Sequence, residues 1–298
     1  LLLNYRINIA SSIYLIGTPM EKTESPLKKY RRQPKLYFNI PSNGKWYNEK
    51  VLAENTYTNL AVFSMTASDE ILFKTPDALI NGDATAKNIS SCIPAILDPW
   101  AIKTLDLDAI LIAIRMSSYG DTMNVSAKCK KCGSDNQYEV GLQKYLDYFS
   151  TKEFEDKVYY ENFVVHIEPL SYKQWTDIQK QQTAYQRALN LNVSRIKEET
   201  EKEKFIQDVI DKINVLVAQA ILDQVVAIEV DGQVETNRKE IDDFLEEAEV
   251  GLFHELKRVI EKNTLEWRLE PESIKCNECE HEDSVRISLD TSDFFVQG

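Results

Sequence analysis

The sequence contains two CxxC pairs, Cys129-Lys-Lys-Cys132 and Cys276-Asn-Glu-Cys279, which together use four of its five cysteines. Apolar residues alternate with polar ones around both pairs, which is the period-two pattern of β-strands with one buried face. The alternating positions are Val125, Ala127, Tyr138, Val140 and Leu142 near the first pair, and Leu265, Trp267, Leu269, Val285, Ile287 and Leu289 near the second. We therefore expect each pair to lie at the tip of a short β-hairpin.

The spacing within each pair suits a metal ion. Two intervening residues let one tight turn direct both sulfurs at a single point. Zinc takes four ligands in a tetrahedron, with sulfur at roughly 2.3 Å, and two CxxC pairs fill that shell without leaving an open position. The sequence thus predicts a split zinc ribbon with a structural, non-catalytic Zn2+. The predicted ligands are Cys129, Cys132, Cys276 and Cys279.

The two half-sites are far apart in the chain, with 143 residues between Cys132 and Cys276. Closing a loop of that length costs about 4–5 kcal/mol. A structural zinc contributes on the order of 10–16 kcal/mol. The metal therefore outweighs the entropy of closure, and we expect it to fix both ends of whatever folds between the half-sites.

Other uses of these cysteines are open at this stage. One is a redox CxxC, although the charged and amide residues around the pairs do not resemble such a site. Another is a pair of disulfides, which needs an oxidising compartment that nothing else in the sequence suggests. His281, two residues after Cys279, offers an alternative ligand to a thiolate. The fifth cysteine, Cys92, is expected to be a small buried residue.

The composition is that of a globular chain large enough for a real core, with 298 residues, 43% hydrophobic and 10% aromatic. Its net charge of −13 disfavours a general nucleic-acid binder, because polyphosphate would repel it. The charge is uneven: residues 1–50 carry nine Lys/Arg against three Asp/Glu, so the remainder stands at −19. A basic arm suits either solubility or docking on an acidic neighbour, including another copy of the chain. No apolar run reaches the ~18–20 residues of a membrane span.

The pattern of elements predicts an α+β fold: a mixed body with a buried central helix, a helical insertion and the split zinc ribbon. The stretch 104–118 is apolar nearly all round, with Thr104 as the candidate N-cap and Gly120 as the stop, so it is expected to be buried. The Thr66 and Asp69 side chains have the spacing of a capping box. Further helices are expected over 171–191, 197–224 and from Thr236 or Asn237 to about 263, with strands at 36–40 and 163–167 and a small hairpin at 225–234.

The expected organisation has four parts. They are a basic extended arm (1–35), an α/β body with the first zinc hairpin (36–145), a mostly helical insertion (146–263), and the second zinc hairpin with a C-terminal strand (264–298).

Signatures of catalysis are missing from the sequence. Nine glycines, none of them clustered, argue against a phosphate-binding loop. His254-Glu255 lacks the second histidine of a zinc-protease helix, and His166 has no identifiable acid or nucleophile. The acidic residues between Asp242 and Glu249 have the spacing of a solvated helix face. We therefore expect no enzymatic activity.

Several motifs, taken in order, resemble the T4-like bacteriophage baseplate proteins associated with the tail hub and its assembly. The similarity covers roughly residues 36–298, and its most specific part is a Ser-Tyr-Gly at 118–120 followed by the first CxxC. The matching stretches are Pro41-Ser-Asn-Gly-Lys-Trp-Tyr47, Met65-Thr-Ala-Ser-Asp-Glu-Ile-Leu72, Leu79-Ile-Asn-Gly82, Arg115-Met-Ser-Ser-Tyr-Gly120, the two CxxC pairs and Asp293-Phe-Phe. Residues 1–35 have no counterpart, and Glu280 stands where a cysteine turn often has glycine, as at Gly133.

The resemblance implies a structural or assembly component of a contractile phage tail baseplate. Its expected partners are other baseplate and tail proteins, and copies of itself through residues 1–35. Its expected location is the virion tail, after assembly in the host cytoplasm. The alternative is a zinc-ribbon nucleic-acid-binding or transcription factor, which Lys128, Lys130, Lys131 and Lys275 beside the cysteines favour. A third is an enzyme with a structural zinc.

Overall fold

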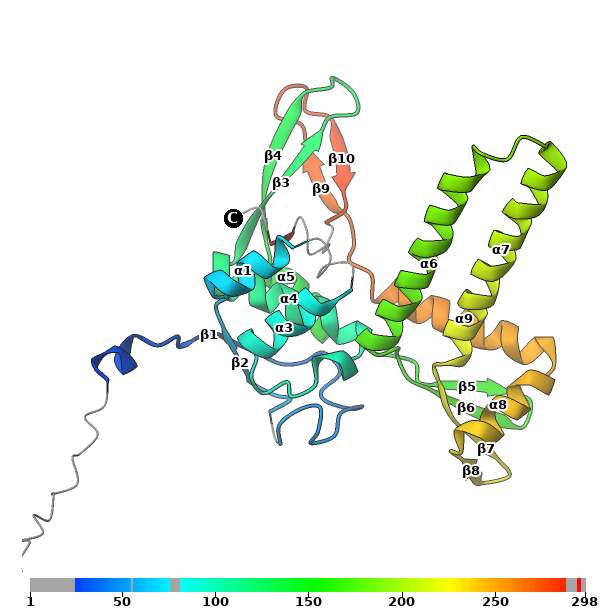
Figure 1. Cartoon of the computed structure of the whole chain (residues 1–298). Helices are drawn as coiled ribbons and strands as arrows, with labels where there is room; N and C mark the ends of the chain where they lie inside the picture. Colours follow the sequence, from blue (N-terminus) through cyan, green and yellow to red (C-terminus); the bar gives the residue numbers. More distant parts are fainter. Residues whose placement is uncertain (1–24, 55, 76–80, 288–293, 296–298) are drawn as a thin grey trace, which may run out of the picture. The chain divides into compact units, whose positions relative to one another are not determined.

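The computed structural model describes residues 25–54, 56–75, 81–287 and 294–295 (Figure 1). Expectations for residues 1–24, Leu79, Ile80, Leu289 and Asp293 lie outside these ranges. The chain divides into two compact units, Leu1–Gln33 and Pro34–Gly298. In the first unit, Ser25 caps a 3-10 helix, η1 (Pro26–Tyr30). That part of the expected extended arm is therefore a helical turn.

The second unit begins with small elements packed around one long helix. The expected capping box at Thr66 is confirmed: its hydroxyl accepts from the Asp69 amide, and Asp69 accepts from the Thr66 amide. Strands β1 and β2 pair antiparallel. The elements are β1 (Pro34–Phe38), β2 (Leu60–Phe63), α1 (Ala67–Phe73), α3 (Asp83–Cys92), η2 (Pro99–Ala101), α4 (Thr104–Tyr119), β3 (Thr122–Lys128), β4 (Asp135–Gly141) and α5 (Gln143–Ser150).

Helix α4 is the centre of the larger core, as its nearly unbroken apolar sequence predicts. Eleven of its sixteen residues are buried. Gly120 ends the helix at φ 97°, a backbone conformation that a side chain disfavours, so the predicted stop is confirmed. The predicted N-cap is wrong by one residue: Lys103 occupies that position and Thr104 is already helical, with its amide bonded to the Leu170 carbonyl.

The end of the chain returns to α4. The Arg115 side chain, 1% exposed, donates to the Phe294 carbonyl and lies against the rings of Tyr119 and Phe294. Phe295 stacks on Phe73 of α1, with the ring centroids 4.4 Å apart. A buried guanidinium that is hydrogen-bonded and covered by aromatic faces is well compensated. Helix α4 therefore anchors both ends of the second unit.

A second core lies under a four-stranded antiparallel sheet of order β5-β6-β7-β8. The helix expected from 236 or 237 to 263 is two helices, since Asn237 caps α8 and the chain breaks at Ala248. Strand β5 was not predicted. The elements are β5 (Lys157–Tyr160), β6 (Phe163–Ile167), α6 (Tyr172–Val193), α7 (Glu199–Leu222), β7 (Val225–Val230), β8 (Gln233–Glu235), α8 (Arg238–Glu247) and α9 (Val250–Glu266).

Helices α6 and α7 form a long antiparallel pair beside this sheet (Figure 1). A Ser171–Gln174 capping box begins α6. Most side chains of the pair are exposed or partly exposed, and Val209 and Ile221 are the only buried ones on α7. Because an isolated two-helix pair buries little apolar surface, its stability depends on the body at its base.

The strand expected through Leu265, Trp267 and Leu269 is wrong. Helix α9 continues to Glu266, leaving Leu265 63% exposed and Trp267 as the C-cap, and the last strands are β9 (Glu272–Lys275) and β10 (Glu282–Val285). Trp267 is buried and stacks on Phe149 of α5, with the ring centroids 6.2 Å apart. Burial of the Trp267 indole favours a helix end here over the strand that the three alternating apolar residues predicted.

Asp106 ties the start of α4 to the loop before it. Its buried carboxylate accepts from the Ser42 amide at 2.8 Å and from the Tyr47 hydroxyl at 2.6 Å, and that hydroxyl accepts from the Lys103 amide. Burial raises the pKa of Asp106 to about 6. The folded state therefore favours the protonated form, and ionisation costs stability as the pH rises through 6.

We expect Tyr47→Phe to lower the free energy of unfolding by about 1–3 kcal/mol at pH 7, because an ionised buried carboxylate loses a donor. At pH 4 Asp106 is protonated in the fold, so the loss should be smaller. Urea unfolding at both pH values measures the difference. Tyr37→Phe is the control, since Tyr37 is 55% exposed. Equal losses at the two pH values would contradict the assigned role of the hydroxyl.

Candidate metal centre

The first cysteine pair lies between β3 and β4, which pair antiparallel from Thr122↔Gly141 to Lys128↔Asp135. The Cys129 amide donates to the Ser134 carbonyl at 2.9 Å, and the Gly133 amide donates to the Cys129 carbonyl at 2.9 Å. Gly133 has φ 76°, with open space where a Cβ would stand. Glycine is therefore favoured at this position by the positive φ angle and not by a lack of space.

The second pair lies between β9 and β10 in the same arrangement. The Cys276 amide donates to the His281 carbonyl at 2.9 Å, and the Glu280 amide donates to the Cys276 carbonyl at 3.0 Å. These bonds have the same offsets as those at Cys129. Glu280 has φ 56°, in the left-handed region that costs a side-chain-bearing residue roughly 1 kcal/mol. The second turn thus adopts the geometry of the first without its glycine.

The structure brings the four predicted cysteines together. Their Sγ atoms all lie within 4.8 Å of one another. The two close contacts both cross between the strand pairs: Cys129 to Cys279 and Cys132 to Cys276, each at 3.6 Å. A disulfide needs about 2.05 Å, and all four thiols are free. A tetrahedron with sulfur at about 2.3 Å from its centre has edges of roughly 3.8 Å, so the donor set fits one tetrahedral metal ion.

The thiols of the site differ in pKa because their hydrogen bonds differ. The Ser134 hydroxyl lies 3.0 Å from the Cys132 sulfur and 3.2 Å from the Cys276 sulfur. It lowers the pKa of Cys132, and it lowers that of Cys276 to about 5. The pKa of Cys279 rises to about 12 despite the bond from the His281 amide, because burial and the neighbouring thiols raise it. Four thiolates this close repel one another unless a cation sits among them.

Asn136 holds the two strand pairs together beside the sulfurs. Its side chain is buried; Oδ1 accepts from the Asn277 amide at 2.9 Å, and Nδ2 donates to the Ser134 carbonyl at 3.1 Å and lies 3.5 Å from the Cys276 sulfur. The sequence analysis missed both Asn136 and Ser134. Asn136 lies on the same face of β4 as Tyr138 and Val140. A polar amide at a position predicted to face inward was the signal that could have identified it.

Ion pairs lie near the cysteines, and one of them joins the two strand pairs. Lys130 contacts Asp283 at 2.6 Å across the strand pairs, and Lys275 contacts Glu280 at 3.3 Å. Near the base of β9, Glu272 accepts from Lys144 at 2.6 Å and from the Tyr145 hydroxyl. These exposed pairs contribute little individually. They do show that the lysines near the cysteines are partly neutralised by acidic neighbours.

The other candidate residues lie elsewhere. Cys92 is fully buried at the end of α3, as expected. The Asp242 carboxylate pairs with Arg238 at 2.5 Å. His166 lies 3.5 Å from Glu229. Among the described residues, the four cysteines are the only group of at least three metal-binding side chains that converge.

The comparisons with known proteins give one match. A family model described as "T4 bacteriophage base plate protein" matches residues 33–296, nearly the whole chain. The chain belongs to this family. The resemblance drawn from the sequence is thereby confirmed, and the family identifies a structural component of a phage baseplate. Neither the curated proteins nor the solved structures include a match.

Membership has further consequences for this baseplate protein. The family implies other phage tail proteins as partners and the virion tail as its location. In the part of the chain that the structure describes, no helix combines the length and the apolar character needed to cross a membrane. The match begins at residue 33, the last residue of the first compact unit, so that basic unit lies almost wholly outside it.

We expect Asn136→Ala to weaken metal binding by roughly 10- to 100-fold, because it removes the bonds that position Cys276 and Asn277. Competition with a chromophoric chelator measures the affinity. Asn124→Ala on β3 is the matched control, since Asn124 is exposed and, among the described residues, no hydrogen bond joins it to the sulfurs. An unchanged metal affinity in Asn136→Ala would show that Asn136 does not position the metal ligands.

Proposed function

We propose that this baseplate protein is a zinc-stabilised structural or assembly component of a contractile tail, acting through contacts with other proteins rather than through catalysis. The convergence of the four cysteine sulfurs carries the zinc part of the proposal. The family match carries the baseplate part. Assembly in the host cytoplasm, before or during tail formation, completes it.

Zinc suits this donor set best. Four thiolates make a closed shell with no position for water or substrate, which is the arrangement of structural zinc sites. The same ligands accept iron, so the identity of the metal needs measurement. Once bound, the ion would join segments 150 positions apart in the chain, Cys129 and Cys279, and clamp the two strand pairs into one split ribbon.

The clamp gives the protein a mechanical role. Residues 146–263, with the second core and the α6–α7 pair, leave the first half-site and return to the second. A metal that fixes both ends limits how far this segment moves relative to α4. We propose that the rigid block so formed is the building unit that neighbouring tail proteins contact.

The nucleic-acid alternative has less support. Lys130 and Lys275, two of the four lysines that suggested it, pair with Asp283 and Glu280. The chain also carries a net charge of −13, which opposes approach to polyphosphate.

Native mass spectrometry should find one zinc ion per chain, and Cys276→Ser should lose it. A strong chelator should lower the unfolding temperature by roughly 10 °C or more, because the structural metal contributes several kcal/mol beyond the cost of closure. Cys92→Ala keeps all four ligands and should keep the zinc. A zinc-free chain that melts at the same temperature would contradict the structural role of the metal. Finding iron in place of zinc would correct the identity of the metal but not the four ligands.

A phage that lacks this chain should yield free heads and no complete tails, and supplying the wild-type chain should restore them. Supplying Cys276→Ser should restore few, whereas Cys92→Ala should restore most. Electron microscopy counts the particles, and peptide mass spectrometry of purified tails tells a resident component from one that leaves after assembly. Normal tails without the chain would refute the proposed function.

A further inference from the structure

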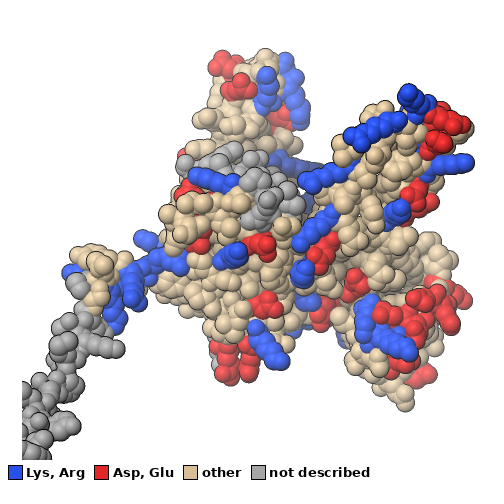
Figure 2. All heavy atoms as spheres, in the orientation of Figure 1, with Lys and Arg blue, Asp and Glu red and all other residues tan. Residues whose placement is uncertain are grey.

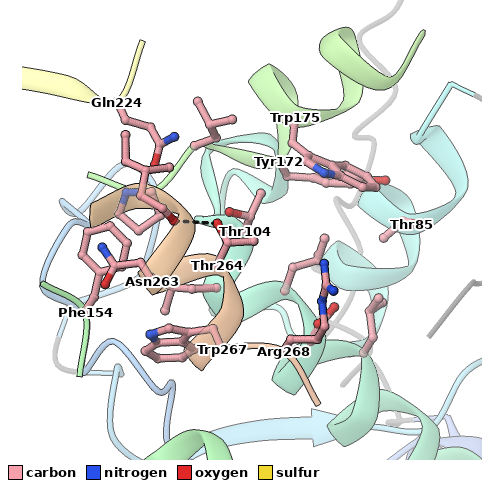
Figure 3. A pocket seen from close by; sticks show the side chains of 17 residues that line it. Thr85, Thr104, Phe154, Tyr172, Trp175, Gln224, Asn263, Thr264, Trp267 and Arg268 are labelled. Atoms are coloured by element: carbon pink, nitrogen blue, oxygen red, sulfur yellow. Dashed lines mark hydrogen bonds between the residues drawn. The ribbon is translucent and has the colours of Figure 1, made fainter. Parts of the chain in front are cut away.

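A cavity of about 690 Å3 lies between α4 and the second core (Figure 3). Helix α4 forms one wall, the start of α6 another, and the end of α9 a third. Its lining is largely apolar, with aromatic rings from Phe154, Tyr172, Trp175 and Trp267. It is separate from the cysteine centre, whose residues do not line it.

One ionisable carboxyl group on α4 lines this cavity, that of Asp108. Among the described residues, no hydrogen bond or ion pair holds it. Asp106, two positions earlier, faces a different environment and has two donors. Burial raises the pKa of both to about 6. Asp106 is thus compensated within the fold, whereas Asp108, which is partly exposed at the cavity, has no such donor among the described residues.

The cavity walls favour a positive charge beside that carboxylate. Trp100, Tyr172 and Trp175 stack in series, with centroids 5.2 Å and 6.2 Å apart. Lys173 already places its ammonium 5.6 Å from the Trp100 ring. Trp175, 41% exposed, is accessible from outside. A carboxylate and aromatic faces together select an ammonium or guanidinium group.

Arg268 lies at the rim and is the nearest internal candidate for this charge. It is exposed, and it forms no ion pair with Asp108 among the described residues. Its carbonyl accepts from the Tyr148 hydroxyl at 3.1 Å. The carboxylate therefore stays uncompensated in the isolated chain.

The chain itself carries a matching basic segment, Lys28-Lys-Tyr-Arg-Arg32. The first unit, residues 1–33, has six Lys/Arg against two Asp/Glu, or +4, which leaves −17 on the remaining 265 residues. Figure 2 shows the Lys and Arg side chains of this segment and the many Asp and Glu side chains around α8. Two second units repel each other, but the first unit of one copy is attracted to the second unit of another.

A short connection joins the segment to β1. Lys28 is six residues from the start of β1, a span of at most about 20 Å. Figure 1 shows β1 and the start of α6 on opposite sides of α4. A second copy has no such restriction.

We propose that the cavity beside Asp108 binds a basic side chain from the Lys28–Arg32 segment of a second copy of this chain. The carboxylate accepts the charged group, and the exposed ring of Trp175 covers its flank. Tyr30, 74% exposed within the segment, adds an aromatic ring for the outer rim. Each copy thus offers both a donor segment and an acceptor cavity.

The test is self-association of the full chain, measured by sedimentation velocity over a range of concentrations. Wild type should associate, and Asp108→Asn should weaken association about tenfold or more, because one partner of a desolvated charge pair is lost. The double substitution Lys29→Gln with Arg31→Gln should weaken it similarly. Combining all three should add little, since they remove the same contact.

Asp243→Asn, which removes an exposed carboxylate on α8 outside the cavity, should leave association unchanged. Asp108→Asn should also unfold at a higher temperature than wild type at pH 7 and at nearly the same temperature at pH 4, so weaker association cannot be ascribed to unfolding. A monomeric wild type, undiminished association of Asp108→Asn, or additive losses would overturn the proposal. So would destabilisation by Asp108→Asn at pH 7, because an internal cation would then fill the cavity. None of these outcomes depends on the metal centre, so this proposal can fail while the proposed function stands.

Discussion

Four sulfur atoms meeting at one point are the constraint on which the rest of the second unit depends. They come from two strand pairs with the same backbone bonding, separated by 143 of the 298 residues. Between them the chain builds a four-stranded sheet, five helices and a second core, then returns through Trp267 to Phe149 of α5. A cation bound at that point would join two strand pairs, each too small to be stable alone, into one element. The buried Asn136 side chain joins the two strand pairs beside the sulfurs, through the Asn277 amide and the Ser134 carbonyl.

Local signals in the sequence carried much of this fold. The apolar composition of α4, the capping boxes at Thr66 and Ser171 and the turn dipeptide at Asp231-Gly232 act over a few residues, so a single sequence reveals them. What failed depended on distant partners. Trp267 ends a helix because Phe149, more than a hundred residues earlier, receives its ring. Strand β5 has only four residues, and its pairing with β6 defines it.

The candidate site divides in the same way. Spacing alone identified the four cysteines, because the chemistry of a tight turn with two thiols is local. Ser134 and Asn136 matter through contacts made with the other strand pair, which spacing does not encode. Asp106 and Asp108 show the limit most clearly: both suit the first turn of a helix equally well, yet one is bonded to Ser42 and Tyr47 and the other opens on a cavity. Their difference exists only after the chain has folded.

The distance between the cysteine pairs also has a consequence during translation. Cys129 leaves the ribosome 150 residues ahead of Cys279, and at 5–20 residues per second the interval is roughly 8–30 seconds. Throughout that time β3 and β4 can pair, but they offer an incomplete set of donors to any ion or oxidant nearby. The donor set is therefore complete only after Cys279 has emerged, and until then the first pair offers two of the four thiols.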